Sequence, residues 1–143
     1  DDDKAYTGTI TSAQQRYPDH AEFYYQHGLA LQQQEQYEQA LAQFTQATNA
    51  PIDDEEAHFK LSALYQVGRN AVFSKQSVQQ GIEALLDYVE AVPADTGLPS
   101  EQWAHFRLAQ LSRLTSATDA VKQHLKLAAN TDDKQLQDNI DDF

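Results

Sequence analysis

The chain of 143 residues contains no cysteine and no methionine. The absence of cysteine excludes disulfide bonds, thiolate catalysis and cysteine-based zinc sites, but it does not indicate a compartment. No apolar run approaches the ~20 residues that a membrane-spanning helix needs. Basic residues are also scarce, since 10 Lys and Arg stand against 22 Asp and Glu, for a net charge of −12. This charge argues against a nucleic-acid backbone or an anionic bilayer as the main partner, because both attract cationic proteins.

The chain starts with aspartate rather than methionine, so we expect it to be processed or excised from a longer chain. The opening "DDDK" at 1–4 resembles the remnant of an affinity or cleavage tag, and the fold prediction therefore takes residues 5–143 as one domain. The acidic charge is uneven, because residues 1–56 hold eleven acids and two bases, whereas residues 57–130 hold six acids and seven bases. We interpret the acidic third either as a soluble surface or as one side of a dock for a basic partner.

Two stretches of the chain are nearly alike, "AHFKLSALYQ" at 57–66 and "AHFRLAQLSR" at 104–113. A third stretch at 21–32 aligns with them when Gly28 is placed over Ser62 and Ala109, at successive offsets of 34 and 47 residues. Each is followed by small and larger apolar residues at helical spacing: Ala40, Phe44 and Ala47; Ala84, Tyr88 and Ala91; Val121, Leu125 and Ala128. Such spacings place these side chains on one stripe of a helix, and the repeated stripes predict stacked helical hairpins that bury a shared core.

The predicted fold is all-α, since the alternation typical of strands is missing. Its parts are the second helix of a partial repeat at 5–18, three repeats at 21–52, 55–93 and 102–130, and a closing helix at 132–143 that carries Leu136, Ile140 and Phe143 on one face. Ten extra residues are predicted near 69–78, between the two helices of the second repeat. Helix starts are predicted from possible caps at Asp19 with Glu22, at Asp53 and Asp54, and at Ser100.

This pattern resembles the tetratricopeptide repeat family, whose repeat has a period of about 34 residues. The residues that carry the resemblance are clearest in the first repeat: Tyr24, Gly28, Leu31, Tyr37, Ala40, Phe44, Ala47 and Pro51. The chain departs from the family at His27, in place of a usual Leu, and at Glu35, in place of a common turn Gly. The resemblance implies a right-handed superhelix of hairpins that serves as a protein-binding scaffold.

In this family the first helices of the hairpins line a concave groove. Transferred to this chain, the groove-facing positions are Glu22, Tyr25, Leu29 and Gln32; Glu56, Phe59, Ala63 and Gln66; Trp103, Phe106, Gln110 and Arg113. The partner-binding candidates among them are Tyr25, Leu29, Gln32, Phe59, Gln66, Trp103, Phe106, Gln110 and Arg113. Tyr25, Phe59 and Phe106 recur at one position, which indicates either a peptide-binding track or packing alone. One family subtype clamps a C-terminal carboxylate with cations and Asn, but Arg113 is the only cation in this set, so an amphipathic helix or an extended apolar segment fits better.

The sequence offers little support for catalysis or for a cofactor. His58 and His105 occupy equivalent positions on successive predicted helices, and neither has a second His at i+3 or i+4, so we predict no metal site. The acids of "PIDDEE" at 51–56 read as helix caps rather than as a calcium loop. No phosphate-binding glycine loop and no G-x-S-x-G motif is present, so we expect no enzyme activity.

The extra segment near 69–78 carries Val72 and Phe73 beside Arg69 and Lys75. It is interpreted either as a loop plus an extra turn whose apolar residues pack on the scaffold, or as a lip that contacts the partner. The function predicted from the whole is a non-catalytic scaffold for a partner's peptide or helix. Two alternatives stay open: a regulatory or substrate-positioning module of a larger enzyme, and an element that self-associates through the unpaired N-terminal helix. The composition is compatible with a bacterial envelope protein.

Overall fold

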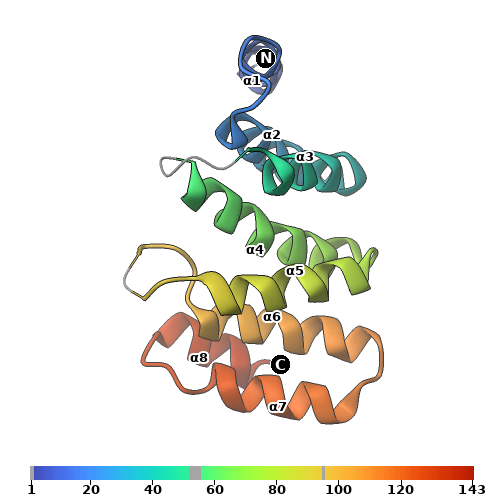
Figure 1. Cartoon of the computed structure of the whole chain (residues 1–143). Helices are drawn as coiled ribbons and strands as arrows, with labels where there is room; N and C mark the ends of the chain where they lie inside the picture. Colours follow the sequence, from blue (N-terminus) through green and yellow to red (C-terminus); the bar gives the residue numbers. More distant parts are fainter. Residues whose placement is uncertain (1, 52–55, 95) are drawn as a thin grey trace.

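The computed structural model describes residues 2–51, 56–94 and 96–143, and of Asp3 the backbone only. In these ranges the chain is all-helical, as predicted, and no strand is present. The helices follow one another along the molecule in chain order (Figure 1): α1 (Asp2–Arg16), α2 (Ala21–Gln33), α3 (Tyr37–Asn49), α4 (Ala57–Ser74), α5 (Val78–Ala91), α6 (Glu101–Leu114), α7 (Thr118–Ala128) and α8 (Lys134–Asp141). None of these described helices is both long enough and apolar enough to cross a membrane.

The helices α2 to α7 form three pairs, each closed by a turn of three residues at 34–36, 75–77 and 115–117. Each helix packs mainly on its neighbours in the sequence. The first helices of the pairs also meet, since α4 contacts both α2 and α6. The helix predicted at 5–18 is α1, which begins earlier than expected because Asp2 to Lys4 are helical, and which ends ahead of Pro18.

Most of the largest buried side chains lie toward the C-terminal end. Six are fully buried, and five of these belong to α5, α6 and α8: Tyr88, Leu85, Leu108, Leu111 and Leu136, with Phe44 in α3 as the sixth. The Tyr88 ring packs at a tilt against Tyr65 of α4, 5.4 Å from centroid to centroid, and the Tyr88 hydroxyl donates a hydrogen bond to the carbonyl of Pro99. Burial also raises the pKa of Tyr88 well above its ordinary value. Tyr88 therefore links Pro99, in the connection before α6, to the core through this hydrogen bond.

The turns of the first and third pairs are built alike. In the first, the Gln36 amide donates to the Leu31 carbonyl at 2.9 Å, and in the third the Ala117 amide donates to Ser112 at 3.0 Å, in both cases across five residues. Glu35 and Ser116 hold the left-handed backbone conformation between them, with φ of 60° and 59°. Such a residue lets the last helical carbonyls find amide partners. Glu35 therefore adopts the conformation for which the repeat family commonly uses glycine.

The second pair differs from the prediction. The segment at 69–78 is mainly helical, because α4 continues to Ser74 and α5 begins at Val78, so the predicted loop is wrong. The helices approach most closely at glycine. A Cβ atom on Gly68 would lie 2.2 Å from Leu85, much as one on Gly28 would lie 2.5 Å from Phe44 in the first pair. Gly68, and not Ser62, thus takes the place of Gly28 in the second pair.

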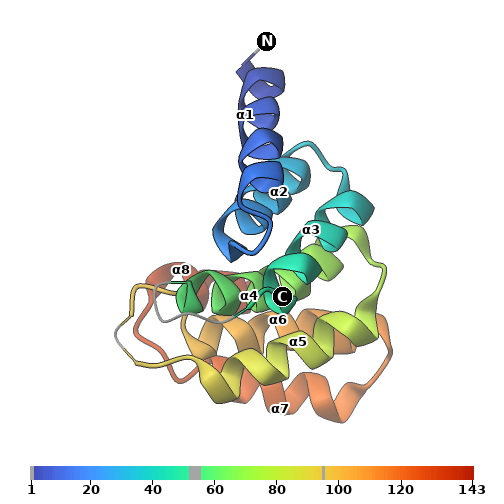
Figure 2. The same cartoon turned by 45° about the horizontal axis from the view of Figure 1, so that its top comes forward.

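Helix α1 stands apart from the rest of the molecule and packs on α2 (Figure 2). Its anchors are the buried Ile10 and a set of polar side chains. The Gln14 amide donates to Gln43 of α3 at 2.7 Å, and its oxygen lies 3.2 Å from the His27 Nδ1 atom of α2. Burial lowers the pKa of His27. His27, the departure from the repeat pattern, thus joins α1 to the first pair.

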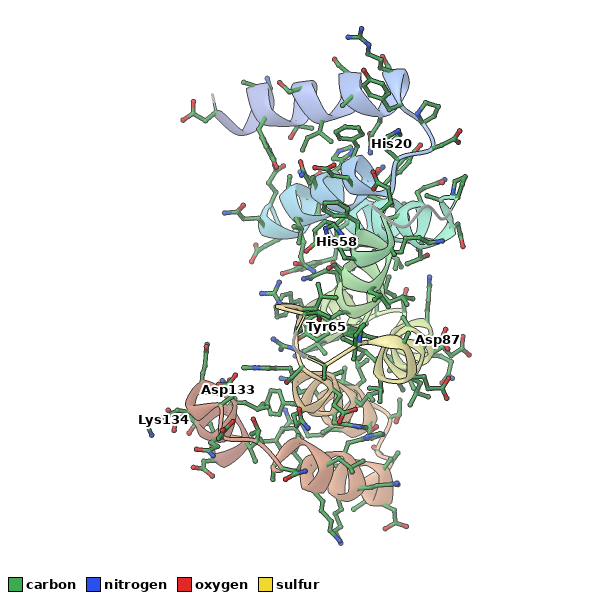
Figure 3. The ribbon with its side chains drawn as sticks, turned by 60° about the vertical axis from the view of Figure 1, so that its left-hand side comes forward. His20, His58, Tyr65, Asp87, Asp133 and Lys134 are labelled. Carbon is green, nitrogen blue, oxygen red and sulfur yellow. The ribbon has the colours of Figure 1, made fainter. Side chains whose placement is uncertain are left out.

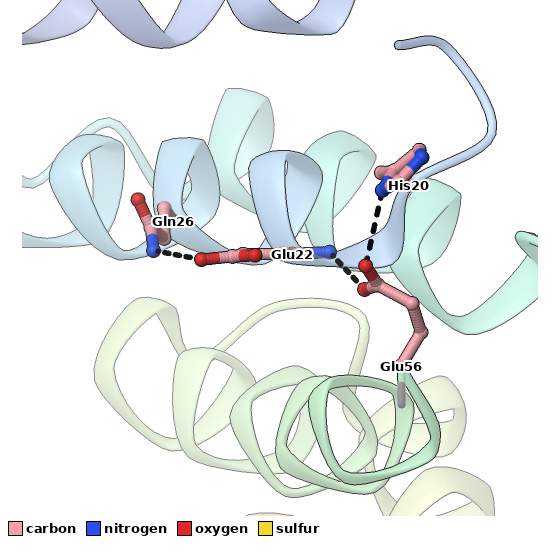
Figure 4. A network of polar contacts seen from close by, with 4 residues as sticks. All are labelled: His20, Glu22, Gln26 and Glu56. Atoms are coloured by element: carbon pink, nitrogen blue, oxygen red, sulfur yellow. Dashed lines mark hydrogen bonds and ion pairs between the residues drawn. The ribbon is translucent and has the colours of Figure 1, made fainter. Parts of the chain in front are cut away.

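Of the predicted helix caps that fall on described residues, one is present as expected and one is not. Ser100 caps α6, since its hydroxyl accepts from the Trp103 amide at 3.2 Å. Asp19 does not cap α2: His20 precedes the helix, and the Glu22 amide donates to the Glu56 carboxylate at 3.0 Å (Figure 4). The other oxygen of Glu56 lies 3.1 Å from His20 Nδ1. The predicted caps at Asp53 and Asp54 lie outside the described residues.

Candidate partner-binding face

Aromatic and polar residues fill the seam between α2 and α4. The rings of Tyr25 and Phe59 lie 5.9 Å apart, centroid to centroid. Burial raises the pKa of Tyr25, although hydrogen bonds to Ser62 and Gln66 and the charge of Arg69 act in the opposite direction. Figure 3 shows His20, His58 and Tyr65 at successive levels along this part of the molecule. Tyr25 and Phe59 are half-buried, so much of the predicted aromatic track serves helix packing.

A polar network continues the seam toward the ends of α2 and α4. The Arg69 guanidinium donates to Gln32 at 3.0 Å and to Gln66 at 3.4 Å, and Asn70 donates to the Tyr37 carbonyl at 3.0 Å. Gln32 is only 7% exposed and Gln66 only 9%. These two predicted partner contacts are therefore occupied inside the molecule, where buried amides need hydrogen-bond partners.

Helix α8 covers the equivalent face of α6. Leu136, Ile140 and Phe143 pack against Phe106, as the spacing along the closing helix predicted. The rings of Phe106 and Phe143 meet edge to face at 6.1 Å, and Phe106 is only 3% exposed. Phe106, a predicted partner contact, is therefore not exposed in this structure, because the closing helix covers it.

Several predicted residues remain accessible to a partner. Arg113 is exposed and stacks on the Phe143 ring at 3.9 Å. Trp103 is partly exposed, and its indole donates to the Asp133 carboxylate at 3.0 Å. That hydrogen bond is the main cause that lowers the pKa of Asp133. The predicted residues that keep partial exposure are Tyr25, Leu29, Phe59, Trp103 and Gln110.

Three further residues join this surface, and the groove prediction did not include them. Arg69 places its guanidinium 4.7 Å from the centroid of Phe73, one turn further along α4. Arg107 of α6 lies 5.8 Å from the same ring and 5.5 Å from Trp103. We call Arg69, Phe73, Trp103 and Arg107 the arginine–aromatic strip. The sequence did offer a signal, because Phe73 and Arg69 stood out in the extra segment.

A pocket of about 460 Å³ opens beside the arginine–aromatic strip. It is lined by Tyr65 of α4, by Trp103 and Arg107 of α6, by the connection at 97–100 and by Asp133. Arg107 donates to the Tyr65 hydroxyl at 3.2 Å and to the Gln110 side chain at 3.1 Å. The pocket therefore combines aromatic walls with a held guanidinium, as in sites that take one anchor residue of a partner.

The two repeated histidines lie in different surroundings. His58 is exposed, and its ring lies tilted against that of its neighbour Phe59, with 3.9 Å between the centroids. His105 instead meets His124 of α7, with 3.0 Å between their Nδ1 atoms. Burial lowers the pKa of both His105 and His124. In the part of the chain that the structure describes, no group of three or more His, Cys, Asp or Glu is arranged to hold a metal ion.

A scan against models of protein families finds no match for this chain, and a search of the curated proteins finds none either.

Proposed function

We propose that the chain is a non-catalytic protein-interaction module, a right-handed stack of helical hairpins of the tetratricopeptide kind. Contacts between the first helices support this arrangement, because α4 meets α2 and α6 while the second helices of the pairs have no contact of similar extent with one another. Helices that touch on one side and spread on the other curve the stack, with α2, α4 and α6 on the inner side. A partner's peptide or helix lies along this inner side.

The arginine–aromatic strip carries the proposal. Aromatic and arginine side chains dominate the binding energy of many protein interfaces, because they bring a large contact area at a low cost in entropy. Phe73 is 39% exposed although it is large and apolar, and the pocket lined by Trp103 lies next to it. Among the other groove candidates, Phe106 is covered by α8, and Gln32 and Gln66 are used between helices. The partner's main anchor therefore sits at the junction of α4 and α6.

Selection of peptides from a random library on the wild-type chain tests this proposal. We expect the selected peptides to lose most of their affinity for the variants Phe73→Ala and Trp103→Ala. The matched control is Leu86→Ala on α5, which also truncates an exposed apolar residue (45% exposed) but lies outside the strip. Circular dichroism and thermal melting verify that each variant folds. Equal losses in the control, or no loss in the strip variants, contradict the proposed face.

Self-association is a second candidate, because α1 leaves aromatic side chains uncovered. Tyr6 is 51% exposed and the nearby Tyr17 is 44% exposed, and the only extensive helix contact of α1 in the described structure is with α2. Light scattering over a concentration series tests it, with Tyr6→Ser as the variant. A strict monomer at every concentration counts against this function.

A further inference from the structure

Two arginines from different helices converge on one exposed aromatic ring. The guanidinium carbons of Arg69 and Arg107 lie 4.7 and 5.8 Å from the centroid of Phe73. Their charges repel, and burial together with the charge of Arg107 lowers the pKa of Arg69. Both arginines are only partly exposed, so water screens this repulsion less than it would at an open surface. The fold thus holds two like charges, one from α4 and one from α6, beside a single aromatic ring.

In the described part of the chain, neither arginine forms an ion pair with a carboxylate. The ion pairs within the described ranges are His20–Glu56 and Lys134–Asp138, although the chain carries 22 acids. The hydrogen-bond partners of the two arginines are neutral side chains: Gln32 and Gln66 for Arg69, Tyr65 and Gln110 for Arg107. Asp133 lines the same pocket as Arg107, but it accepts from the Trp103 indole and from the Leu136 amide. Within the described residues, an incoming anion therefore finds two guanidiniums that form no ion pair with a carboxylate.

We propose that Arg69 and Arg107 together accept the carboxylate of an Asp or Glu side chain within a segment of a partner protein. An apolar residue beside that acid contacts Phe73 or enters the pocket next to Trp103. This inference rests on the proposed function and deepens it, because it states the chemistry of the segment that the face selects. Guanidinium groups suit this role, since they pair with carboxylates in a planar geometry and stack on aromatic rings at the same time.

The surroundings favour a peptide over a free anion. A small inorganic anion would contact only the two guanidiniums and would leave Phe73, 39% exposed, and the pocket wall at Trp103 in water. A segment with an acid flanked by apolar residues covers all of these groups at once. Because the arginine–aromatic strip spans α4 and α6, the partner's segment contacts two helical pairs. Its affinity therefore depends on how the second and third pairs are placed relative to each other.

The test starts from the tightest peptide that a random library yields on the wild-type chain. A twin peptide carries Gln or Asn at every Glu or Asp, and fluorescence anisotropy measures both. We expect the twin to bind about tenfold or more weakly, because hydrogen bonds to charged groups are worth more than neutral ones. The double variant Arg69→Gln/Arg107→Gln should lose a similar factor for the acidic peptide and little for the twin. The variant Arg69→Lys/Arg107→Lys, which keeps the charge, should fall between them.

Arg16→Gln is the control for a single arginine, because it removes one guanidinium near an aromatic ring, 5.7 Å from the centroid of Tyr17 and away from the strip. Equal binding of the twin peptide overturns the inference and leaves the proposed function standing. An equal loss in Arg16→Gln also overturns it, in favour of long-range attraction. Displacement by inorganic phosphate alone at similar concentrations indicates a free-anion site, and loss of self-association in the double variant indicates a second copy as the occupant. Either result overturns it. If no selected peptide competes at the strip, the proposed function itself fails.

Discussion

The segments 57–66 and 104–113 share most of their residues, yet they lie in different surroundings. Phe59 is half-buried against Tyr25 at the seam between α2 and α4. Phe106, which matches Phe59 in the aligned sequences, is 3% exposed and lies beneath α8. The two segments thus carry similar residues but have different neighbours. Phe59 packs against α2 of the first pair, whereas Phe106 packs against the closing helix α8.

The polar residues of the two segments diverge as well. The Lys60 amine donates to the Ala50 carbonyl at 2.8 Å, beyond the end of α3, whereas Arg107 reaches Tyr65 of α4. His58 is exposed, and His105 pairs with His124. Repetition along a chain therefore predicts which side of a helix is apolar, but the role of each residue depends on what the fold places opposite it.

The largest expected effect is the difference in stability loss between Phe106→Ala and Phe59→Ala. Phe106→Ala should lower the free energy of unfolding by about 3–5 kcal/mol, because it leaves a cavity in a closed cluster. Phe59→Ala should lower it by roughly half as much or less, since the ring is only half-buried and water can fill the space. Urea unfolding followed by circular dichroism measures both. Equal losses would show that the exposure of the two rings does not govern their contribution.

Truncating Phe143, which packs against Phe106, should make Phe106 more exposed and so more like Phe59. Phe143→Ala takes away the edge-to-face contact with Phe106 and should lower the free energy of unfolding by about 1–2 kcal/mol. The single tryptophan, Trp103, lies 6.0 Å from Phe106 and reports the change through its fluorescence. A red shift of the folded-state emission is expected. An unchanged spectrum and unchanged stability would mean that α8 does not shield this face.

The histidine pair should make stability depend on pH. The pKa of His105 and of His124 is lower in the folded chain than in the unfolded one, chiefly through burial, with the charge of Glu101 opposing the shift at His105. The unfolded chain therefore takes up protons first as the pH falls below about 6.5, the ordinary pKa of histidine, and the stability present above that pH is lost.

We expect the melting temperature to drop between pH 7 and 5, and to drop less in His105→Gln/His124→Gln. Part of the dependence remains in that variant because burial also lowers the pKa of His27. The matched control, His58→Gln, removes the imidazole of the first segment without touching the pair. An identical pH dependence in the double variant and the wild type would contradict the role of the pair.

The smallest effect is expected at the Lys60/Arg107 position. Arg107→Lys loses the hydrogen bonds to Tyr65 and Gln110 and should cost about 0.5–1 kcal/mol. Lys60→Arg keeps a donor for the Ala50 carbonyl and should change stability by less than about 0.5 kcal/mol. Urea midpoints measure both changes. A larger loss from Lys60→Arg than from Arg107→Lys would reverse the comparison.

The apolar spacing predicted the helices and the closing face of α8, because residues such as Leu136 and Ile140 act through local periodicity. Contacts between distant parts of the chain escaped prediction. Glu56, which precedes α4, caps the start of α2. The aligned sequences placed Ser62 opposite Gly28, whereas the close approach of α4 and α5 occurs at Gly68. The strip was missed for a related reason: Phe73 meets Arg107 only because α4 continues through a segment predicted as a loop.

The polar attachment of α1 affects the order in which parts of the molecule unfold. Beside the buried Ile10, the link of α1 to the first pair includes polar contacts of Gln14 with Gln43 and with the imidazole of His27. Water can replace such hydrogen bonds at a small net cost, whereas the cluster around Tyr88 and Leu108 separates only with loss of its apolar contacts. Amide hydrogens of α1 should therefore exchange with solvent long before those of α5 and α6. A protease should remove the first helix while the remaining hairpins stay folded.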